Sequence, residues 1–216
     1  MTTLHPIELQ CSVCEEAFKS SEIGSCGFAN RRTDFRPNYW GVNPTNYFYH
    51  LCPHCGFCAP KSVFEMNFDK IEMKHKMKKL GPLKNDNISK KLERAMICLE
   101  ILNELGIVNV NDFTFANNWI EPYWWAEEQG EIKKFGNIAL RYFYGAFEKN
   151  QVPADQIITI KYLMGEINRR IGNIEKAIEL FDEVLSLAEN DNELKFIYNL
   201  ALQQKTDPKD NIEKTH

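Results

Sequence analysis

The chain has 216 residues, of which 44% are hydrophobic and 26% charged, and its formal net charge is −4. This length suits one ordinary domain or two small ones, and the composition excludes a wholly disordered protein. No apolar run approaches the roughly 20 residues of a membrane helix, and residues 1–10 lack the basic start and apolar core of a secretory signal. We therefore expect a cytoplasmic protein without a membrane partner, whose seven cysteines are thiols or metal ligands rather than disulfides.

Charge is distributed unevenly along the chain. Residues 1–68 carry a net charge of −1, residues 69–91 of +5 and residues 92–216 of −8. Because these shifts coincide with changes in composition, we predict four segments. They are an N-terminal zinc-ribbon-like module over 1–68, a basic helix and hinge over 69–91, an α-helical domain over 92–205 and a polar tail over 206–216.

The first segment contains six of the seven cysteines and many Pro, Gly, Asn and aromatic residues. This composition favours short strands and turns over regular helix. Val13–Phe18 and Tyr47–Leu51 are candidate strand edges beside the cysteines, and residues 36–44 have the turn residues of a loop. A polar cluster of Arg31, Arg32 and Asp34 precedes that loop, where an ion pair that fixes the loop is the simplest interpretation.

Two Cys-x-x-Cys turns give the strongest chemical signal in the sequence. Two residues between the cysteines let one tight turn present both sulfurs to one metal, and zinc accepts four such ligands in a tetrahedron. Gly56 suits the left-handed backbone position after the second turn, where the first turn has Glu15 instead. We predict one structural Zn²⁺ ion held by Cys11, Cys14, Cys52 and Cys55.

Other roles for the cysteines are weaker. Cys26 and Cys58 are expected to be small core residues, although either could in principle join the metal site. The tetrapeptide from Cys52 to Cys55 also occurs in dithiol oxidants, where a helix follows the first thiol, but Gly56 and Pro60 argue against a helix here. A zinc-dependent hydrolase needs an open metal position, against which four available thiolates argue.

The basic segment has the pattern of a helix over 61–80, which Gly81-Pro82 ends, and residues 84–89 look like a polar hinge. Its lysines, within 70–91, could contact the phosphates of a nucleic acid. A solvated helix face is the preferred interpretation of these lysines.

From Lys91 onward the apolar pattern is helical. The first helix has apolar residues on two faces and ends at Gly106, so we expect it to be packed on both sides. Further helices are predicted over about 117–129, 132–149, 154–171, 174–189 and 192–205. The tail that follows is expected to be frayed. The aromatic residues between Trp119 and Trp125 are expected to fill the core between helices, with a ligand groove as the alternative.

Small residues inside this helical part have the spacing of a tetratricopeptide-like hairpin. In this pattern Gly165 lets two helices approach, Gly172 makes the turn between them, and Phe181 fills the groove beside Ala177. A similar triplet occurs upstream at Ala139, Phe143 and Ala146, in a less regular unit. The predicted fold is therefore mainly α, with a small β zinc-ribbon-like module at the N-terminus and tetratricopeptide-like hairpins after it.

The N-terminal motifs resemble those of DUF2225, a bacterial and archaeal family of unknown function. The resemblance covers residues 7–68 well and the helical part through Trp124, Gly130 and the hairpin unit. It implies a zinc-ribbon-like head with helical repeats, and it supplies no catalytic activity. The sequence departs from the family pattern at Cys58. The matching positions are Cys11, Cys14, Asp34, Pro37, Tyr39, Gly41, Asn43, Pro44, Tyr47, Cys52, Pro53, Cys55 and Gly56.

These features together predict a zinc-binding protein-interaction module that is not an enzyme. Helical hairpin repeats stack into concave surfaces that hold protein partners, so a protein partner is expected. The first alternative is a nucleic-acid-binding protein that uses the zinc module and the segment 70–91. A zinc-dependent hydrolase or a dithiol redox protein is the third interpretation.

Overall fold

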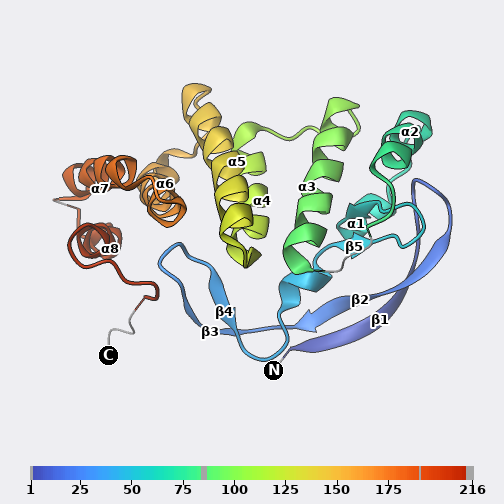
Figure 1. The fold of residues 1–216 in the computed structure, drawn as a ribbon, viewed down its shortest axis with the longest axis horizontal. Coiled ribbons are helices and arrows are strands. Elements are labelled where there is room, and N and C mark those ends of the chain that lie inside the picture. The colour runs from blue at the N-terminus through green and yellow to red at the C-terminus, as the bar shows by residue number, and fades with distance from the viewer. Residues whose placement is uncertain (1, 84–86, 190, 213–216) are drawn as a thin grey trace. The chain divides into compact units, whose positions relative to one another are not determined.

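The structure is a computed structural model that describes residues 2–83, 87–189 and 191–212 (Figure 1). These residues are mainly α-helical with small antiparallel strand pairs near the N-terminus, which confirms the predicted fold class. None of the helices in the described ranges is long and apolar enough to cross a membrane. Part of the predicted hinge, residues 84–86, lies outside the described residues.

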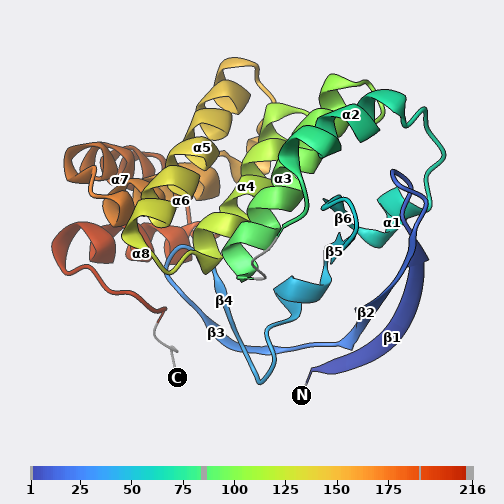
Figure 2. The ribbon, with the colours of Figure 1, turned by 45° about the vertical axis from the view of Figure 1, so that its right-hand side comes forward.

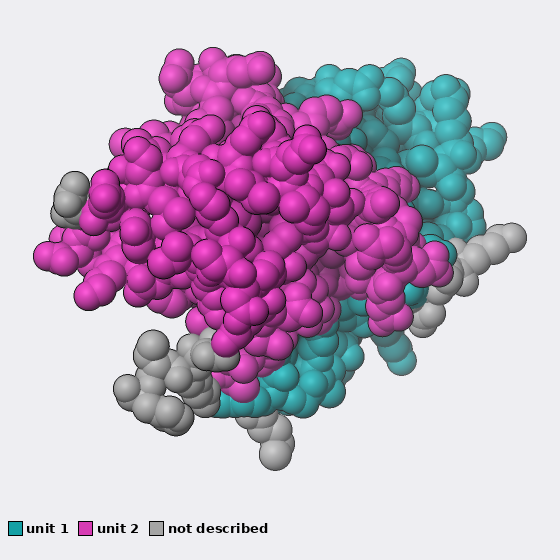
Figure 3. Space-filling model, turned by 60° about the vertical axis from the view of Figure 1, so that its left-hand side comes forward, with its two compact units in different colours: residues 1–27, 39–110 teal, residues 28–38, 111–216 magenta. Residues whose placement is uncertain are grey.

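The described residues form two compact units, which Figure 3 distinguishes by colour. Unit 1 contains residues 1–27 and 39–110, and unit 2 contains residues 28–38 and 111–216. Each unit is therefore built from two separate stretches of the chain. The predicted segments, in contrast, follow one another in sequence order.

Unit 1 begins with a long antiparallel ribbon of β1 (Thr3–Gln10) and β2 (Ala17–Ser25). Most of its side chains are exposed, but the paired Leu9 and Phe18 are buried at the end that carries the first cysteine turn. The sequence did not indicate this ribbon, because a two-stranded ribbon held mainly by backbone hydrogen bonds has little hydrophobic alternation. The second cysteine turn joins the short strands β5 (His50–Leu51) and β6 (Cys58–Ala59), which are also antiparallel.

The helices of unit 1 are α1 (Lys61–Phe64), α2 (Ile71–Leu80) and α3 (Ile88–Glu104) (Figure 2). The prediction of one continuous helix over 61–80 was wrong, since the chain leaves the helical conformation between α1 and α2. Gly81, in a left-handed backbone conformation, ends α2 as predicted. α3 is buried on several sides, and it packs on both β6 and α2.

Unit 2 contains the strand β3 (Phe28–Arg31), most of β4 (Pro37–Tyr39) and the helices that follow Asn111. The Asn111 side chain accepts a hydrogen bond from the Thr114 N–H and so begins the first helix earlier than predicted. That helix ends where Ala126 becomes extended, which corrects the predicted range 117–129. The helices are α4 (Asp112–Trp125), α5 (Gln129–Glu148), α6 (Ile157–Ile171), α7 (Ile174–Ala188) and α8 (Lys195–Thr206).

The α6–α7 hairpin forms as its small residues predict. Gly172 adopts a left-handed conformation (φ 95°) between the helices, and Ala177 is buried. A Cβ atom on Gly165 would lie 2.6 Å from the ring of Phe181, so only glycine permits this approach. Whether α4–α5 and α6–α7 are copies of one repeat stays a prediction.

The loop between β3 and β4 and the chain after α8 lie together in unit 2. Thr33 N–H donates to the Asp210 carbonyl oxygen (3.0 Å), and Ile212 N–H donates to the Arg31 carbonyl oxygen (3.0 Å). The prediction of a frayed tail is thus wrong for residues 207–212, because the backbone of Arg31 and Thr33 supplies hydrogen-bond partners that the sequence of the tail could not reveal.

Candidate metal centre

The two cysteine turns have the same backbone geometry. Glu15 N–H donates to the Cys11 carbonyl oxygen (2.9 Å), and Gly56 N–H donates to the Cys52 carbonyl oxygen (3.0 Å). Glu15 and Gly56 both adopt left-handed conformations, with φ of 71° and 76°. Glutamate therefore takes the conformation that favours glycine, as the structural match between the two turns requires.

The structure brings the sulfur atoms of Cys11, Cys14, Cys52 and Cys55 within 4.8 Å of one another. Between the turns, the sulfurs of Cys11 and Cys55 are 3.7 Å apart and those of Cys14 and Cys52 are 3.6 Å apart. A zinc ion with four sulfurs at about 2.3 Å has sulfur–sulfur edges of about 3.8 Å, whereas a disulfide is close to 2 Å. The separations therefore fit a tetrahedral metal site and are too long for disulfides.

Burial and hydrogen bonds within the cluster change the pKa values of its thiols. Cys11 and Cys52 are fully buried, and Cys14 and Cys55 are partly exposed. A hydrogen bond from the Cys11 thiol, and then one from Cys55, lowers the pKa of Cys52, while hydrogen bonding to Cys52 raises the pKa of Cys11. One thiolate thus opposes the ionisation of its neighbours, and a divalent cation is what would allow all four to ionise together.

The remaining cysteines lie outside the cluster. The buried Cys58 thiol donates to the Lys91 carbonyl oxygen at 3.6 Å, so α3 rather than the metal site engages it. Burial raises the pKa of Cys58 above its ordinary range and that of Cys98 to about 11, so both are neutral core thiols. Cys26 is exposed.

A cavity of about 380 Å³ adjoins the two partly exposed cysteines within unit 1. Lys74 and Lys78 of α2 contribute cations to its lining, and His54 of the second turn lies there as well. Four thiolates around a divalent cation would carry a net charge of −2, which nearby lysines would stabilise. The other residues of the lining are Val13, Cys14, Cys55, Met77, Gly81 and Pro82.

The lysines of α2 are exposed or half-buried, and several pair with acidic groups of unit 1. Lys70 and Lys74 lie 2.6 and 3.2 Å from the Glu15 carboxylate, and Lys76 lies 2.8 Å from Glu104. The Lys70 hydrogen bond, and then that of Lys74, lowers the pKa of Glu15. Three lysines of the basic segment are thus paired with two carboxylates of unit 1.

The cluster of Arg31, Arg32 and Asp34 belongs to unit 2. Arg32 pairs with Asp34 (Nε to Oδ1 2.8 Å), the loop-fixing ion pair that the sequence suggested. The Asp34 carbonyl oxygen also accepts a hydrogen bond from the Trp124 indole (3.1 Å). Trp119 and Tyr123 are buried among the helices, as predicted for the aromatic run.

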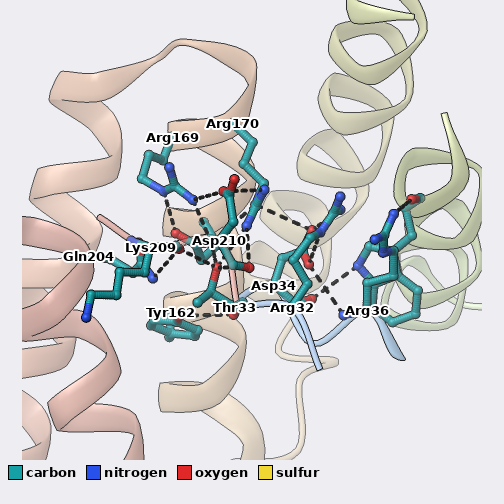
Figure 4. Close-up of polar contacts among 12 residues, drawn as sticks. Arg32, Thr33, Asp34, Arg36, Tyr162, Arg169, Arg170, Gln204, Lys209 and Asp210 are labelled. Carbon is teal, nitrogen blue, oxygen red and sulfur yellow. Dashed lines mark hydrogen bonds and ion pairs between the residues drawn. The ribbon is translucent and has the colours of Figure 1, made fainter. Parts of the chain in front are cut away.

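Sequence reasoning missed a polar network in unit 2, which Figure 4 shows. The fully buried Glu166 carboxylate accepts hydrogen bonds from Thr33 (2.6 Å) and from Arg169 (2.7 Å). Tyr162 donates to the Thr33 carbonyl oxygen at 2.9 Å. The helical spacing of Glu166, Arg169 and Arg170 was visible in the sequence, but nothing there indicated that a β-hairpin tip would be their partner.

The chain matches the model of a known protein family. The family described as uncharacterized protein conserved in bacteria (DUF2225) matches residues 5–207, so its match extends through the helices as well as the cysteine turns. Searches among curated proteins and among solved structures found no match. The two cysteine turns and the helices after them therefore belong to one family pattern, and the chain is a member of the DUF2225 family.

Proposed function

We propose that the four clustered cysteines hold one structural Zn²⁺ ion and that the protein is a binding module without catalytic activity. The observation that carries this proposal is the four-sulfur cluster itself. Zinc is the common metal of sites with four cysteine ligands, and four protein ligands complete its tetrahedron. Such a closed site has no position for water or substrate, so its role is to stabilise the fold.

The connections of the four cysteines support a stabilising role. The first turn lies between β1 and β2, and the second lies between β5 and β6. A shared ion would join these two strand pairs, and the free energy of metal binding would add to the stability of unit 1. All seven cysteines are free thiols in the structure, and the reducing cytoplasm is the compartment that we propose.

The helical hairpins of unit 2 are the proposed scaffold for a protein partner. Ile174 and Ile178, one turn apart on α7, are exposed to 51% and 39%, and Phe196 on α8 is exposed to 54%. Apolar side chains on packed hairpins are a common basis for partner recognition.

The alternatives receive less support. For a nucleic-acid-binding protein, the ion pairs of Lys70, Lys74 and Lys76 with carboxylates reduce the charge available to phosphates. For a dithiol redox protein, the turn at Cys52 would need to open a helix, but β6 follows it. For a hydrolase, zinc would need an open position, which a four-cysteine site lacks.

Metal analysis of the purified protein tests the proposed centre. We expect about one zinc per chain, and cobalt substituted for zinc should give the absorption of a tetrahedral thiolate site. A folded protein that contains no metal, and that takes up neither ion, would refute the structural zinc site.

Pull-down from native lysate tests the binding role separately. Wild-type protein and an Ile174→Asp/Ile178→Asp variant would serve as baits, with exposed Asn199→Asp on α8 as the charge control. Proteins retained by the wild type and the control but lost by the double variant would be the expected partners. Identical retention by all three baits would exclude this face of α7.

A further inference from the structure

Unit 2 contains a cavity of about 300 Å³ whose lining is rich in guanidinium groups. This volume is at the lower end of the range of small-molecule sites. Three of the lining residues are arginines from two different parts of the unit. The lining consists of Arg32, Tyr123, Gln129, Ile132, Arg169, Arg170 and Asp210.

Tyr123 gives a second, independent indication of a ligand. Its side chain is 1% exposed, and its hydroxyl has no hydrogen-bond partner among the described residues. Burial raises the pKa of this phenol well above its ordinary value, so the hydroxyl keeps its proton and remains a donor. A buried hydroxyl without a partner is costly, and a ligand in the cavity that it lines would supply the missing acceptor.

The arginines are held in place before any ligand arrives. Their side chains are only 18%, 17% and 13% exposed for Arg32, Arg169 and Arg170. The fully buried carboxylates of Asp34 and Glu166 each accept a hydrogen bond from them, from Arg32 Nε (2.8 Å) and from Arg169 Nε (2.7 Å). Fixed guanidinium groups bind an oxyanion with little further loss of side-chain entropy.

The Asp210 carboxylate already lies against two of these arginines, as Figure 4 shows. Its Oδ1 atom is 3.1 Å from Arg170 Nη1 and 3.6 Å from Arg169 Nη2, yet its side chain is 73% exposed. The Asp210 backbone has its own hydrogen bonds, because its carbonyl oxygen accepts from Thr33 N–H (3.0 Å) and from Arg170 Nη2 (3.2 Å). The carboxylate can therefore rotate away from the arginines while the chain stays in place.

The charge balance of the cavity indicates which kind of group would replace the Asp210 carboxylate. The three arginines of the lining face the buried carboxylates of Asp34 and Glu166 and the exposed one of Asp210. Removing the Asp210 side chain leaves one uncompensated positive charge in the cavity. A monoanionic group would restore neutrality.

We propose that this cavity binds the oxyanion group of a small molecule, a phosphate or a carboxylate, which displaces the Asp210 side chain from Arg169 and Arg170 and accepts a hydrogen bond from Tyr123. Asp210 then acts as an internal competitor that lowers the affinity for the ligand. This site goes beyond the proposed zinc and scaffold roles and depends on neither of them.

Titration calorimetry on the purified 216-residue protein tests the proposal, with inorganic phosphate and acetate as probes at constant ionic strength. The Asp210→Asn variant removes the competing charge, and we expect it to bind the preferred probe about tenfold more tightly than the wild type does. The matched control is exposed Asp207→Asn, which changes the net charge equally and should leave the affinity unchanged. Tighter binding of phosphate would identify a phosphate ligand, and tighter binding of acetate a carboxylate.

Tyr123→Phe provides the second measurement. Because the hydroxyl has no partner, its removal should leave the unfolding temperature unchanged or raised. In the Asp210→Asn protein, adding Tyr123→Phe should weaken probe binding about tenfold relative to Asp210→Asn alone. The proposal is overturned if Asp210→Asn shows no saturable binding of either probe, if Asp207→Asn has the same effect as Asp210→Asn, or if Tyr123→Phe leaves the affinity unchanged.

Discussion

The Thr33 hydroxyl donates a 2.6 Å hydrogen bond to the Glu166 carboxylate, although the two residues are 133 positions apart in the sequence. Both side chains are fully buried, so the contact is shielded from water. Together with the hydrogen bond from Tyr162 to the Thr33 carbonyl oxygen, it attaches the tip of the β3–β4 hairpin to α6. The hairpin is thus a structural part of the helical unit.

Thr33→Val should destabilise unit 2 by about 1–3 kcal/mol, because a buried carboxylate loses a donor while the shape of the side chain is kept. Thr33→Ser retains the hydroxyl and is the matched control, with a loss below about 1 kcal/mol. Urea denaturation followed by circular dichroism measures both. Equal losses for the two variants would show that the methyl group, and not the hydrogen bond, matters at this position.

Cys14→Ser or Cys55→Ser should remove zinc and unfold unit 1, since three thiolates hold the ion much more weakly than four. Zinc content by elemental analysis and helix content by circular dichroism are the measurements, and the helices of unit 2 should remain folded. Cys26→Ser changes an exposed cysteine outside the cluster and should retain one zinc. Loss of zinc from the Cys26 variant would contradict the assignment of ligands.

Gly56 and Glu15 have the same left-handed backbone conformation, but substitutions at the two positions should differ in their effect on stability. Gly56→Ala places a Cβ atom 2.6 Å from the Gly81 carbonyl oxygen in a conformation that disfavours side chains, so we expect a loss of more than about 2 kcal/mol. Glu15→Gly relieves the same backbone conformation and should be tolerated. Thermal unfolding in the presence of zinc compares them, and a stable Gly56→Ala protein would argue against the described turn.

Gly165→Ala should destabilise the α6–α7 hairpin by about 1–3 kcal/mol, because its Cβ atom would meet the Phe181 ring. Phe181→Leu shortens that ring and should recover part of the loss when combined with Gly165→Ala. A double-mutant cycle from urea denaturation gives the coupling. Additive effects of the two changes would mean that the helices do not approach at this point.

Nucleic acids should bind weakly, at roughly the 10⁻⁴–10⁻⁶ M of non-specific contacts, with an affinity that falls steeply with salt. Fluorescence anisotropy with single-stranded RNA and duplex DNA at two salt concentrations measures this. Submicromolar binding near physiological salt, lost when Lys74, Lys76, Lys78 and Lys79 are replaced by Glu, would favour the nucleic-acid alternative over the proposed scaffold role.

Local chemistry explains why parts of the fold were predictable. Gly81, Gly106 and Gly172 end helices through left-handed conformations that the sequence reveals directly. The spacing inside each cysteine turn fixes which sulfurs can face a common point. In these cases a few adjacent residues determine the local structure.

Long-range contacts explain what the sequence could not reveal. Asp34 looked like half of a local ion pair, and its pair with Arg32 is indeed local. Its further contact with Arg170 (3.7 Å) and the contacts of Asp210 depend on α6, whose position relative to the hairpin no local pattern encodes. In the sequence, Tyr123 likewise looks like any core aromatic residue. Only the assembled helices show that its buried hydroxyl has no hydrogen-bond partner among the described residues.

The chain passes between the two units three times, after residues 27, 38 and 110. No single cut therefore yields both units whole: a break near residue 110 leaves the helices without their hairpin, and an earlier break divides unit 1. Recombination or gene fusion at one junction would transfer an incomplete unit. The family match over residues 5–207 accordingly includes residues of both units.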